Sequence, residues 1–331
     1  SCYQQGVALR HLLGLAGTDR VGRHQVTDEP DDADIILFVE NAEFDDYFYT
    51  RLLSDPLIEK HPGKCFIYNE VDYPWTVLPG LYCSMPRRGF DPDYHRVFTY
   101  LFTANPYIAR FEDRASTEPR WLYSFQGAAN HHVRRRIYRL TDNRARIEDT
   151  GAFSIWQSAE EEVRERQRDY ALTLYDSKYV LCPRGTGTSS YRLYETIQAG
   201  RVPVVISDQW VQPDLPQWEF ILRVRENQVA RLPELMREHE SEWPDRARHA
   251  TRLWKDQLAP DVVFDRAVEE LAALKARRNG KLPPSRRGIY YYRVRANWLT
   301  LPLTRWLKTN LGIRGLRNHV HKVRVRLMGE P

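Results

Sequence analysis

The segment from Tyr179 to Asp208 constrains the fold of this chain more than any other part of the sequence. It opens with a short apolar run, residues 179–182, which stops at a proline. The residues that follow include Gly185 and Gly187, and glycines of this kind permit a tight loop that a ligand can approach closely. The run and the loop together predict the end of a strand at a binding surface.

The second half of the same segment predicts a helix and a further strand. Ser189 or Ser190 can cap the helix N-terminus, and Gly200 can close the helix as a left-handed cap. Residues 202–206 are apolar without alternation, which is typical of a parallel strand buried on both faces. Strand, glycine loop, helix and strand in this order predict an α/β protein with a parallel sheet.

The charges near the predicted helix start are unusual for a purely structural element. Arg184 precedes the helix and Arg192 lies in its first turns, although a helix N-terminus itself carries partial positive charge. An anion bound between backbone N–H groups and two guanidinium groups would explain them. Glu195 follows Arg192 by three residues, so an ordinary surface ion pair is the alternative for these two. The loop is not a P-loop, because it lacks the lysine and the glycine spacing.

At these residues the chain resembles a known family. The pattern Cys-Pro-Arg-Gly-x-Gly-x-x-Ser-Tyr-Arg-Leu-x-Glu over residues 182–195, followed by Ala-Gly-Arg-Val-Pro-Val-Val-Ile-Ser-Asp over residues 199–208, is similar to the signature of exostosin-like glycosyltransferases (family 47). The likeness is greatest to their bacterial, single-module members. Weaker similarity includes residues 68–74 and 123–135, and the resemblance covers most of residues 30–240.

The resemblance implies a GT-B architecture, in which two Rossmann-like domains face each other across a cleft. It implies an N-terminal acceptor domain and a nucleotide-sugar domain, and the polar, irregular residues 104–119 are interpreted as the linker that places these domains at residues 1–115 and 116–276. It also implies an inverting, metal-independent transfer of a sugar from a UDP-sugar to a glycan or a lipid-linked acceptor, with no cofactor besides this donor substrate. A non-catalytic carbohydrate-binding or partner subunit on the same fold is the alternative function.

Donor binding is expected at the carboxyl ends of the strands of the second domain, where doubly wound sheets bind ligands. The expected residues follow two strand ends and the last strand of the signature. They are Gly127, His131, Arg184, Gly185, Gly187, Ser189, Ser190, Arg192, Glu195 and Asp208. Glu195 is expected to bind ribose hydroxyls, and Asp208 to line the sugar pocket or to cap a turn. For His131 and His132, helix capping or solvation is an alternative to ligand binding.

Inverting transfer also needs a general base for the acceptor hydroxyl. Candidates are the acids that follow strands of the first domain, namely Asp72, Glu70 and Glu40, with Glu43 close behind. The sequence does not choose among them, because acids at strand ends also cap turns. Asp91-Pro-Asp93 has the spelling of a metal-binding motif, but it lacks a preceding apolar strand and is interpreted as a loop. No metal site is expected.

Composition places the chain among globular enzymes and singles out its C-terminal segment. Of 331 residues, 42% are hydrophobic and 28% charged, and the four cysteines show no metal-binding spacing, which favours a reducing cytoplasm. Residues 281–331 hold twelve Lys/Arg and one acid, a net charge of +11. Because the whole chain carries +5, the remainder carries −6 (5 − 11). The tail, residues 277–331, is interpreted either as packing on the first domain or as a peripheral contact with the inner face of a membrane. Nothing in it is typical of a nucleic-acid module.

Overall fold

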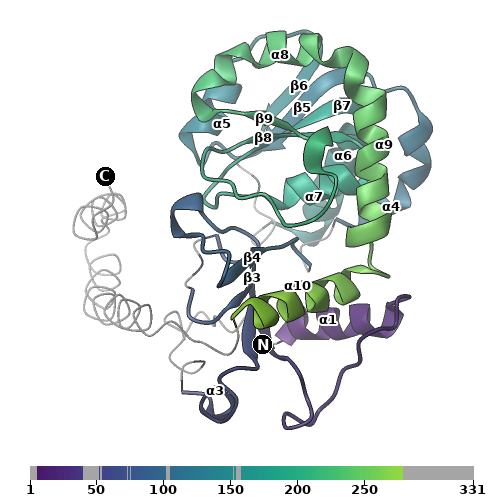
Figure 1. Cartoon of the computed structure of the whole chain (residues 1–331). Helices are drawn as coiled ribbons and strands as arrows, with labels where there is room; N and C mark the ends of the chain where they lie inside the picture. The colour runs from purple at the N-terminus through teal and green to yellow at the C-terminus, as the bar shows by residue number, and fades with distance from the viewer. Residues whose placement is uncertain are drawn as a thin grey trace. The chain divides into compact units, whose positions relative to one another are not determined.

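Two parallel sheets organise the chain. The computed structural model describes residues 6–39, 52, 54–72, 74, 76–101, 105–151, 153 and 158–278. Among these residues the strand order is β1-β2-β3-β4 in one sheet and β6-β5-β7-β8-β9 in the other (Figure 1). Parallel neighbours throughout both sheets confirm the predicted pair of Rossmann-like domains and a GT-B-like fold.

The first sheet is built from short strands. Its members are β1 (Ile36–Val39), β2 (Cys65–Asn69), β3 (Gly80–Tyr82) and β4 (His95–Val97). β1 and β2 are largely apolar runs, whereas β3 has only three residues and no pattern that identifies it. Helix α3 (Pro56–Lys60) precedes β2, and the side chain of Asp55 caps it by accepting from the N–H of Leu57 at 2.9 Å.

The second sheet is larger and carries helices on both faces. Its strands are β5 (Trp121–Gly127), β6 (Ala145–Asp149), β7 (Ser177–Pro183), β8 (Val202–Ile206) and β9 (Leu222–Val224). Its helices are α5 (His132–Ile137), α6 (Glu160–Tyr175), α7 (Tyr191–Gln198), α8 (Leu232–Glu238) and α9 (Trp243–Leu253). The 3-10 segments η4 (Trp218–Phe220), η5 (Glu226–Arg231) and η6 (Glu240–Glu242) and the π-helical turn η7 (Trp254–Leu258) connect the C-terminal elements.

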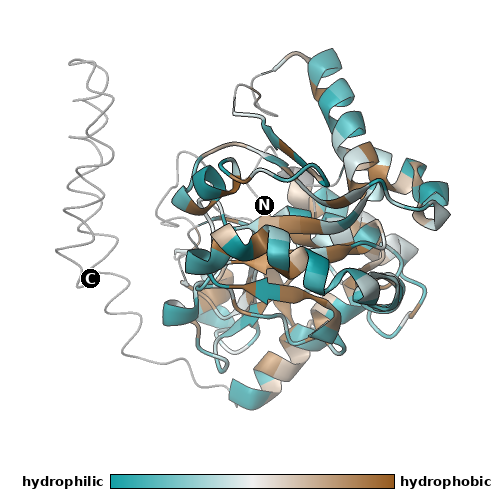
Figure 2. Cartoon of the chain, turned by 90° about the horizontal axis from the view of Figure 1, so that it is seen from above, coloured by the Kyte–Doolittle hydropathy of each residue, from teal (hydrophilic) through white to brown (hydrophobic). Residues whose placement is uncertain are grey.

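Alternate residues of β7 show how both faces are covered. Val180 and Cys182 pack in one core with α6, α7 and α9, while Tyr179 and Leu181 pack in another with α5 and α8. Successive side chains of a strand point to opposite faces, so a strand buried on both sides must be continuously apolar. Figure 2 shows the strands as the hydrophobic interior and the outer helices as mostly hydrophilic.

The segment between the sheets and the last described helix differ from the sequence prediction. The irregular linker predicted at residues 104–119 is wrong, because α4 (Pro106–Arg110) and η3 (Glu112–Ser116) form there. Asn105 caps α4, and Ile108 is fully buried. Helix α10 (Val263–Arg278) lies beside α1 (Val7–Thr18), and both pack into the core of the first sheet (Figure 1). The predicted second-domain range, residues 116–276, therefore contains a helix that covers the first sheet.

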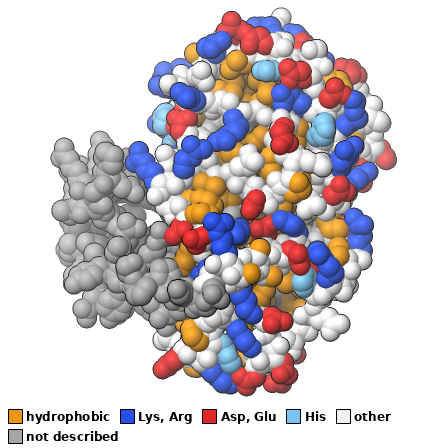
Figure 3. Space-filling model, viewed as in Figure 1, with side chains coloured by type: hydrophobic (Ala, Val, Ile, Leu, Met, Phe, Trp, Pro, Cys, Tyr) orange, Lys and Arg blue, Asp and Glu red, His pale blue; other side chains and the backbone are white. Residues whose placement is uncertain are grey.

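One prediction, the role of the basic tail, concerns residues that the structure does not describe. The basic tail lies outside the described residues apart from residues 277–278, which end α10. In the described part of the chain, no helix combines the length and apolar character needed to span a bilayer. The face in Figure 3 intersperses cationic, anionic and apolar side chains.

Candidate functional site

The predicted donor residues lie where the strands of the second sheet end. Gly127, Pro183 and Ile206 are the last residues of β5, β7 and β8, which are adjacent and parallel. Their carboxyl ends therefore meet at one edge of the sheet, and the loops that follow converge there. Ser190 begins α7 at this edge and accepts from the N–H of Arg192 at 3.3 Å, so the predicted serine cap is confirmed.

The glycine loop is shaped by close neighbours. A Cβ added at Gly185 would lie 2.7 Å from Nη2 of Arg134, and one at Gly187 would lie 2.6 Å from Oδ1 of Asp72. Neither glycine has a positive φ, whereas Gly200 has φ +63° and is the predicted left-handed cap. Gly185 and Gly187 are thus needed for space rather than for backbone conformation. The space beside these two glycines is filled by side chains of the protein itself, Arg134 and Asp72.

Arg192 and Glu195 form a buried polar cluster rather than a surface pair. Arg192 is 5% exposed, donates to the carbonyl oxygen of Gln126, and lies 4.8 Å from the ring centroid of Phe125. Glu195 is 7% exposed and accepts from the hydroxyl of Tyr170 at 2.8 Å. The surface ion-pair alternative is therefore wrong. The buried Nε of Arg192 has no hydrogen-bond partner among the described residues.

Burial raises the pKa of Glu195 to about 7, opposed by the Tyr170 hydrogen bond and by Arg192. The folded protein therefore holds the proton of the Glu195 carboxyl more tightly than the unfolded chain does. The stabilisation of the fold that this proton gives is lost as the pH rises from about 4.5 to about 7. We expect Glu195→Gln to raise the free energy of unfolding relative to the native protein at pH 8, by at most about 3 kcal/mol, and to change it little at pH 5. Urea denaturation at both pH values measures this.

A glutamate with the opposite shift is the control. Arg144 and Lys178 lower the pKa of Glu240, so this carboxylate stabilises the fold at neutral and higher pH and loses its effect on acidification. Glu240→Gln should therefore weaken the protein at pH 8 and matter less in acid. An identical pH dependence for the two variants would contradict the assignment of Glu195.

Arg184 and Asp208 are linked through Glu226. Nη1 of Arg184 lies 3.7 Å from Oε1 of Glu226, which also accepts from the N–H of Asp208 at 3.0 Å. Asp208 returns the bond by accepting from the N–H of Glu226 at 3.2 Å. The Asp208 carboxylate thus bonds to the first residue of η5, which differs from both predicted roles, lining the sugar pocket and capping the turn that follows it. No sequence pattern indicated that Glu226 belongs to this site, because its position depends on how the chain continues after β9 into η5.

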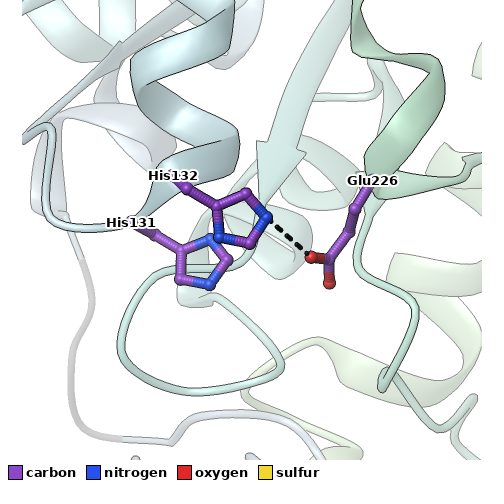
Figure 4. Close-up of side chains that lie close together, drawn as sticks. All are labelled: His131, His132 and Glu226. Atoms are coloured by element: carbon purple, nitrogen blue, oxygen red, sulfur yellow. Dashed lines mark ion pairs between the residues drawn. The ribbon is translucent and has the colours of Figure 1, made fainter.

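His131, His132 and Glu226 come together beside this pair (Figure 4). The ring centroids of the two histidines are 4.2 Å apart, and Nε2 of His132 lies 3.4 Å from Oε2 of Glu226. Their ligand atoms lie within 4.8 Å of one another, close enough to hold a metal ion. Burial and the nearby Arg184 lower the pKa of His131 to about 4, and a cationic neighbour of this kind disfavours a metal ion.

His131 also has the structural role that the sequence left open. It is the N-cap of α5, and its Nδ1 accepts from the N–H of Val133 at 3.4 Å. The ring is thus held at the start of α5, facing the loops of the site.

Arg134 is a site residue that the sequence did not distinguish from Arg135 and Arg136, the arginines beside it in α5. Its guanidinium donates to three backbone carbonyl oxygens, those of Arg184 at 3.1 Å, Ala128 at 3.3 Å and Pro183 at 3.4 Å. Burial and the charge of Arg192 lower its pKa to about 10. The available signal was its spacing: Arg134 lies three residues before the buried Ile137, so both share the inner face of α5.

The first domain contributes Asp72 but not Glu70 to this edge. The carboxylate end of Asp72 lies against Gly187, although the residue as a whole is exposed. Desolvation raises its pKa, opposed by Arg134 and by the Gly187 backbone. Glu70 instead accepts from the hydroxyl of Tyr68 and from the N–H of Leu101, which gives it a structural role. Glu40 and Glu43 lie outside the described residues.

An exposed tyrosine lies near the site, whereas the Asp91–Asp93 turn and a cavity beside α9 do not belong to it. Tyr191 is 43% exposed at the start of α7, and its ring meets that of Tyr100 edge-on at 6.2 Å. Oδ1 of Asp91 accepts from the N–H of Asp93 at 3.1 Å, so Asp91–Asp93 is a turn as predicted. A surface cavity of about 380 Å³ beside α9 is lined by Phe220, Glu242 and other residues that do not belong to this site.

Comparison with known proteins shows a similarity over the middle of the chain. The Exostosin GT47 domain model matches residues 86–239. An Exostosin-1 homolog of Caenorhabditis elegans is 29% identical over 143 residues, which cover 38% of this chain and 37% of that protein. Exostosin-1 of Drosophila melanogaster is also 29% identical over 143 residues, covering 38% of this chain and 19% of that protein.

A shorter match is Exostosin-1c of Danio rerio, which is 33% identical over 72 residues, or 21% of this chain and 10% of that protein. The chain thus spans well under half the length of these relatives, and the likeness to bacterial single-module members stays a prediction. The signature between β7 and β8, the two parallel sheets and the matched region agree: residues 86–239 are similar to the Exostosin GT47 domain of the exostosin-like glycosyltransferases.

Proposed function

We propose that this protein is a glycosyltransferase that moves a sugar from a UDP-sugar to a glycan or lipid-linked acceptor, with inversion and without a metal ion. The observation that supports it most is the convergence of Arg134, Arg184 and Arg192 on the edge where α7 begins. A nucleotide diphosphate is the leaving group of such a transfer, and its charge must be stabilised as the bond to the sugar breaks. Guanidinium groups and helix N-terminal N–H groups supply that stabilisation.

Asp72 is the proposed general base. In the transfer, the acceptor oxygen attacks the anomeric carbon, the bond from that carbon to the phosphate oxygen breaks, and the hydroxyl proton passes to Asp72. Attack from the face opposite the leaving group inverts the configuration. Desolvation raises the pKa of Asp72, which makes its carboxylate a stronger base than an ordinary aspartate. Asp72 follows β2 of the first sheet, whereas the arginines belong to the second, so the proposed base and the groups that stabilise the leaving group come from different domains.

A direct test measures nucleotide binding and donor turnover. Isothermal titration with UDP, ADP, GDP and inorganic diphosphate is expected to show the tightest binding for UDP, and slow hydrolysis of a UDP-sugar is expected in the absence of acceptor. UDP binding without any turnover would favour the non-catalytic partner subunit. Absence of binding to every nucleotide would contradict the donor-site assignment.

Chelation tests metal independence. Transfer or donor hydrolysis is expected to be unchanged by EDTA, because arginines rather than a metal ion are proposed to stabilise the leaving diphosphate. His132→Ala removes one member of the His131, His132 and Glu226 cluster and serves as the matched variant, since a metal held there would then be lost. Loss of activity in EDTA that manganese restores, in the native protein but not in this variant, would overturn the metal-free mechanism.

A further inference from the structure

A serine of the first domain lies in the glycine loop of the second. Ser84 follows β3, precedes η2 (Arg87–Gly89) and is completely buried. Its Oγ accepts from the N–H of Thr188 at 2.8 Å and from that of Ser189 at 3.4 Å. These N–H groups directly precede α7, and they are the type of group that an oxygen of a bound phosphate would engage. The Ser84 hydroxyl is therefore in the place of a phosphate oxygen.

Asp72 takes a second anion position in the same loop. Its Oδ1 lies against Gly187, where an added Cβ would meet it at 2.6 Å and would also clash with Oγ of Ser84. The Gly187 backbone and Arg134 both favour its charged form. A carboxylate between a backbone N–H and a guanidinium occupies surroundings that suit a phosphate equally well.

Other bonds hold the two domains together beside this contact. The N–H of Arg87 donates to the carbonyl oxygen of Gln209 at 2.9 Å. The hydroxyl of Tyr194 donates to the carbonyl oxygen of Phe98 at 3.2 Å. Ser84 and Asp72 are thus held in the loop by a wider set of interdomain contacts, and they cannot leave it without a local rearrangement.

We propose that Ser84 and Asp72 occupy the diphosphate position of the ligand-free protein, and that donor binding displaces them. The inference rests on the proposed function, since it requires a nucleotide diphosphate as the ligand. Displacement frees Asp72 from Gly187 at the moment when the donor arrives, so the base becomes available to the acceptor only in the donor complex. Ser84 and Asp72 also weaken the apparent affinity for the donor, which equals the intrinsic affinity multiplied by the fraction of molecules in which these two side chains have left the loop.

Ser84→Ala tests the inference because it removes the competing hydroxyl without changing charge. Isothermal titration is expected to show about three- to tenfold tighter UDP binding, in line with the loss of one or two neutral hydrogen bonds. Binding of uridine, which has no phosphate, is expected to be unchanged. A general loosening of the fold would instead change the affinities for UDP and for uridine alike. Ser116→Ala is the control, because the Ser116 hydroxyl bonds to Asp113 in an exposed 3-10 segment outside the site.

The outcomes separate this inference from the proposed function. If the native protein binds neither UDP nor a UDP-sugar, the proposed function fails. If the native protein binds UDP but Ser84→Ala binds it no more tightly, the displacement idea is wrong and the function stands. Should Ser84→Ala not fold, Asp72→Asn at an exposed position replaces it, and it must bind both UDP and inorganic diphosphate more tightly than the native protein does.

Discussion

Asp72→Asn is expected to lower kcat for sugar transfer by about 10²–10⁴-fold, the usual contribution of a general base. Asparagine keeps the size and the contact with Gly187, but it cannot take the proton of the acceptor hydroxyl. UDP affinity is expected to improve, because the carboxylate that competes with the donor phosphates loses its negative charge. Initial rates with saturating donor and acceptor, together with titration of UDP, measure the two effects separately.

Two variants serve as controls for Asp72. Asp93→Asn changes an aspartate in an exposed turn of the same domain that pairs with Arg277, and it is expected to leave kcat unchanged. Glu70→Gln weakens the bonds to Tyr68 and Leu101, so it is expected to lower thermal stability more than kcat. If Glu70→Gln instead abolished turnover in a folded protein while Asp72→Asn remained active, the base would be Glu70.

The pH profile gives an independent check of the base. Because desolvation raises the pKa of Asp72, the acid limb of kcat/KM is expected to lie above the pH at which an ordinary aspartate titrates. The limb should disappear in Asp72→Asn. A limb that persists in this variant would assign the titration to another group.

Arg192→Ala is expected to weaken UDP binding by about 1.5–3 kcal/mol, or roughly 10- to 150-fold, which is the range for hydrogen bonds to charged groups. It is also expected to lower the free energy of unfolding, because Arg192 is 5% exposed and its removal leaves the Gln126 carbonyl without this donor and Glu195 without a nearby cation. Titration with UDP and urea denaturation measure the two losses.

Arg184→Ala is the matched comparison. Its ion pair with Glu226 spans 3.7 Å, so truncation is expected to cost UDP affinity with a smaller change in stability. Arg192→Lys keeps the charge but not the planar fork, and it is expected to recover only part of the affinity. Unchanged UDP affinity in both alanine variants would show that the arginines serve the fold alone.

The sequence predicted the structure best in the segment that follows β7. The glycine loop, the Ser190 cap, the left-handed Gly200 and the buried strand β8 are all as predicted, because each depends on neighbours within a few residues. Sequence patterns failed where an element is short or at a sheet edge. Strand β3 has three residues, and the edge strand β6 is largely polar, so neither carries the apolar run that marks a buried strand.

The sequence by itself determined that a parallel sheet forms and that basic residues gather at a glycine loop, since apolar continuity, caps and glycines are local properties of the chain, while the pair of domains followed from the family resemblance. Only the tertiary structure decided which side chains meet there. It brought Arg134 onto the carbonyls of Ala128, Pro183 and Arg184, and it placed Ser84 and Asp72 against a loop about a hundred residues further along the chain. Such contacts depend on how the sheets pack together, and no spacing within either segment encodes that geometry.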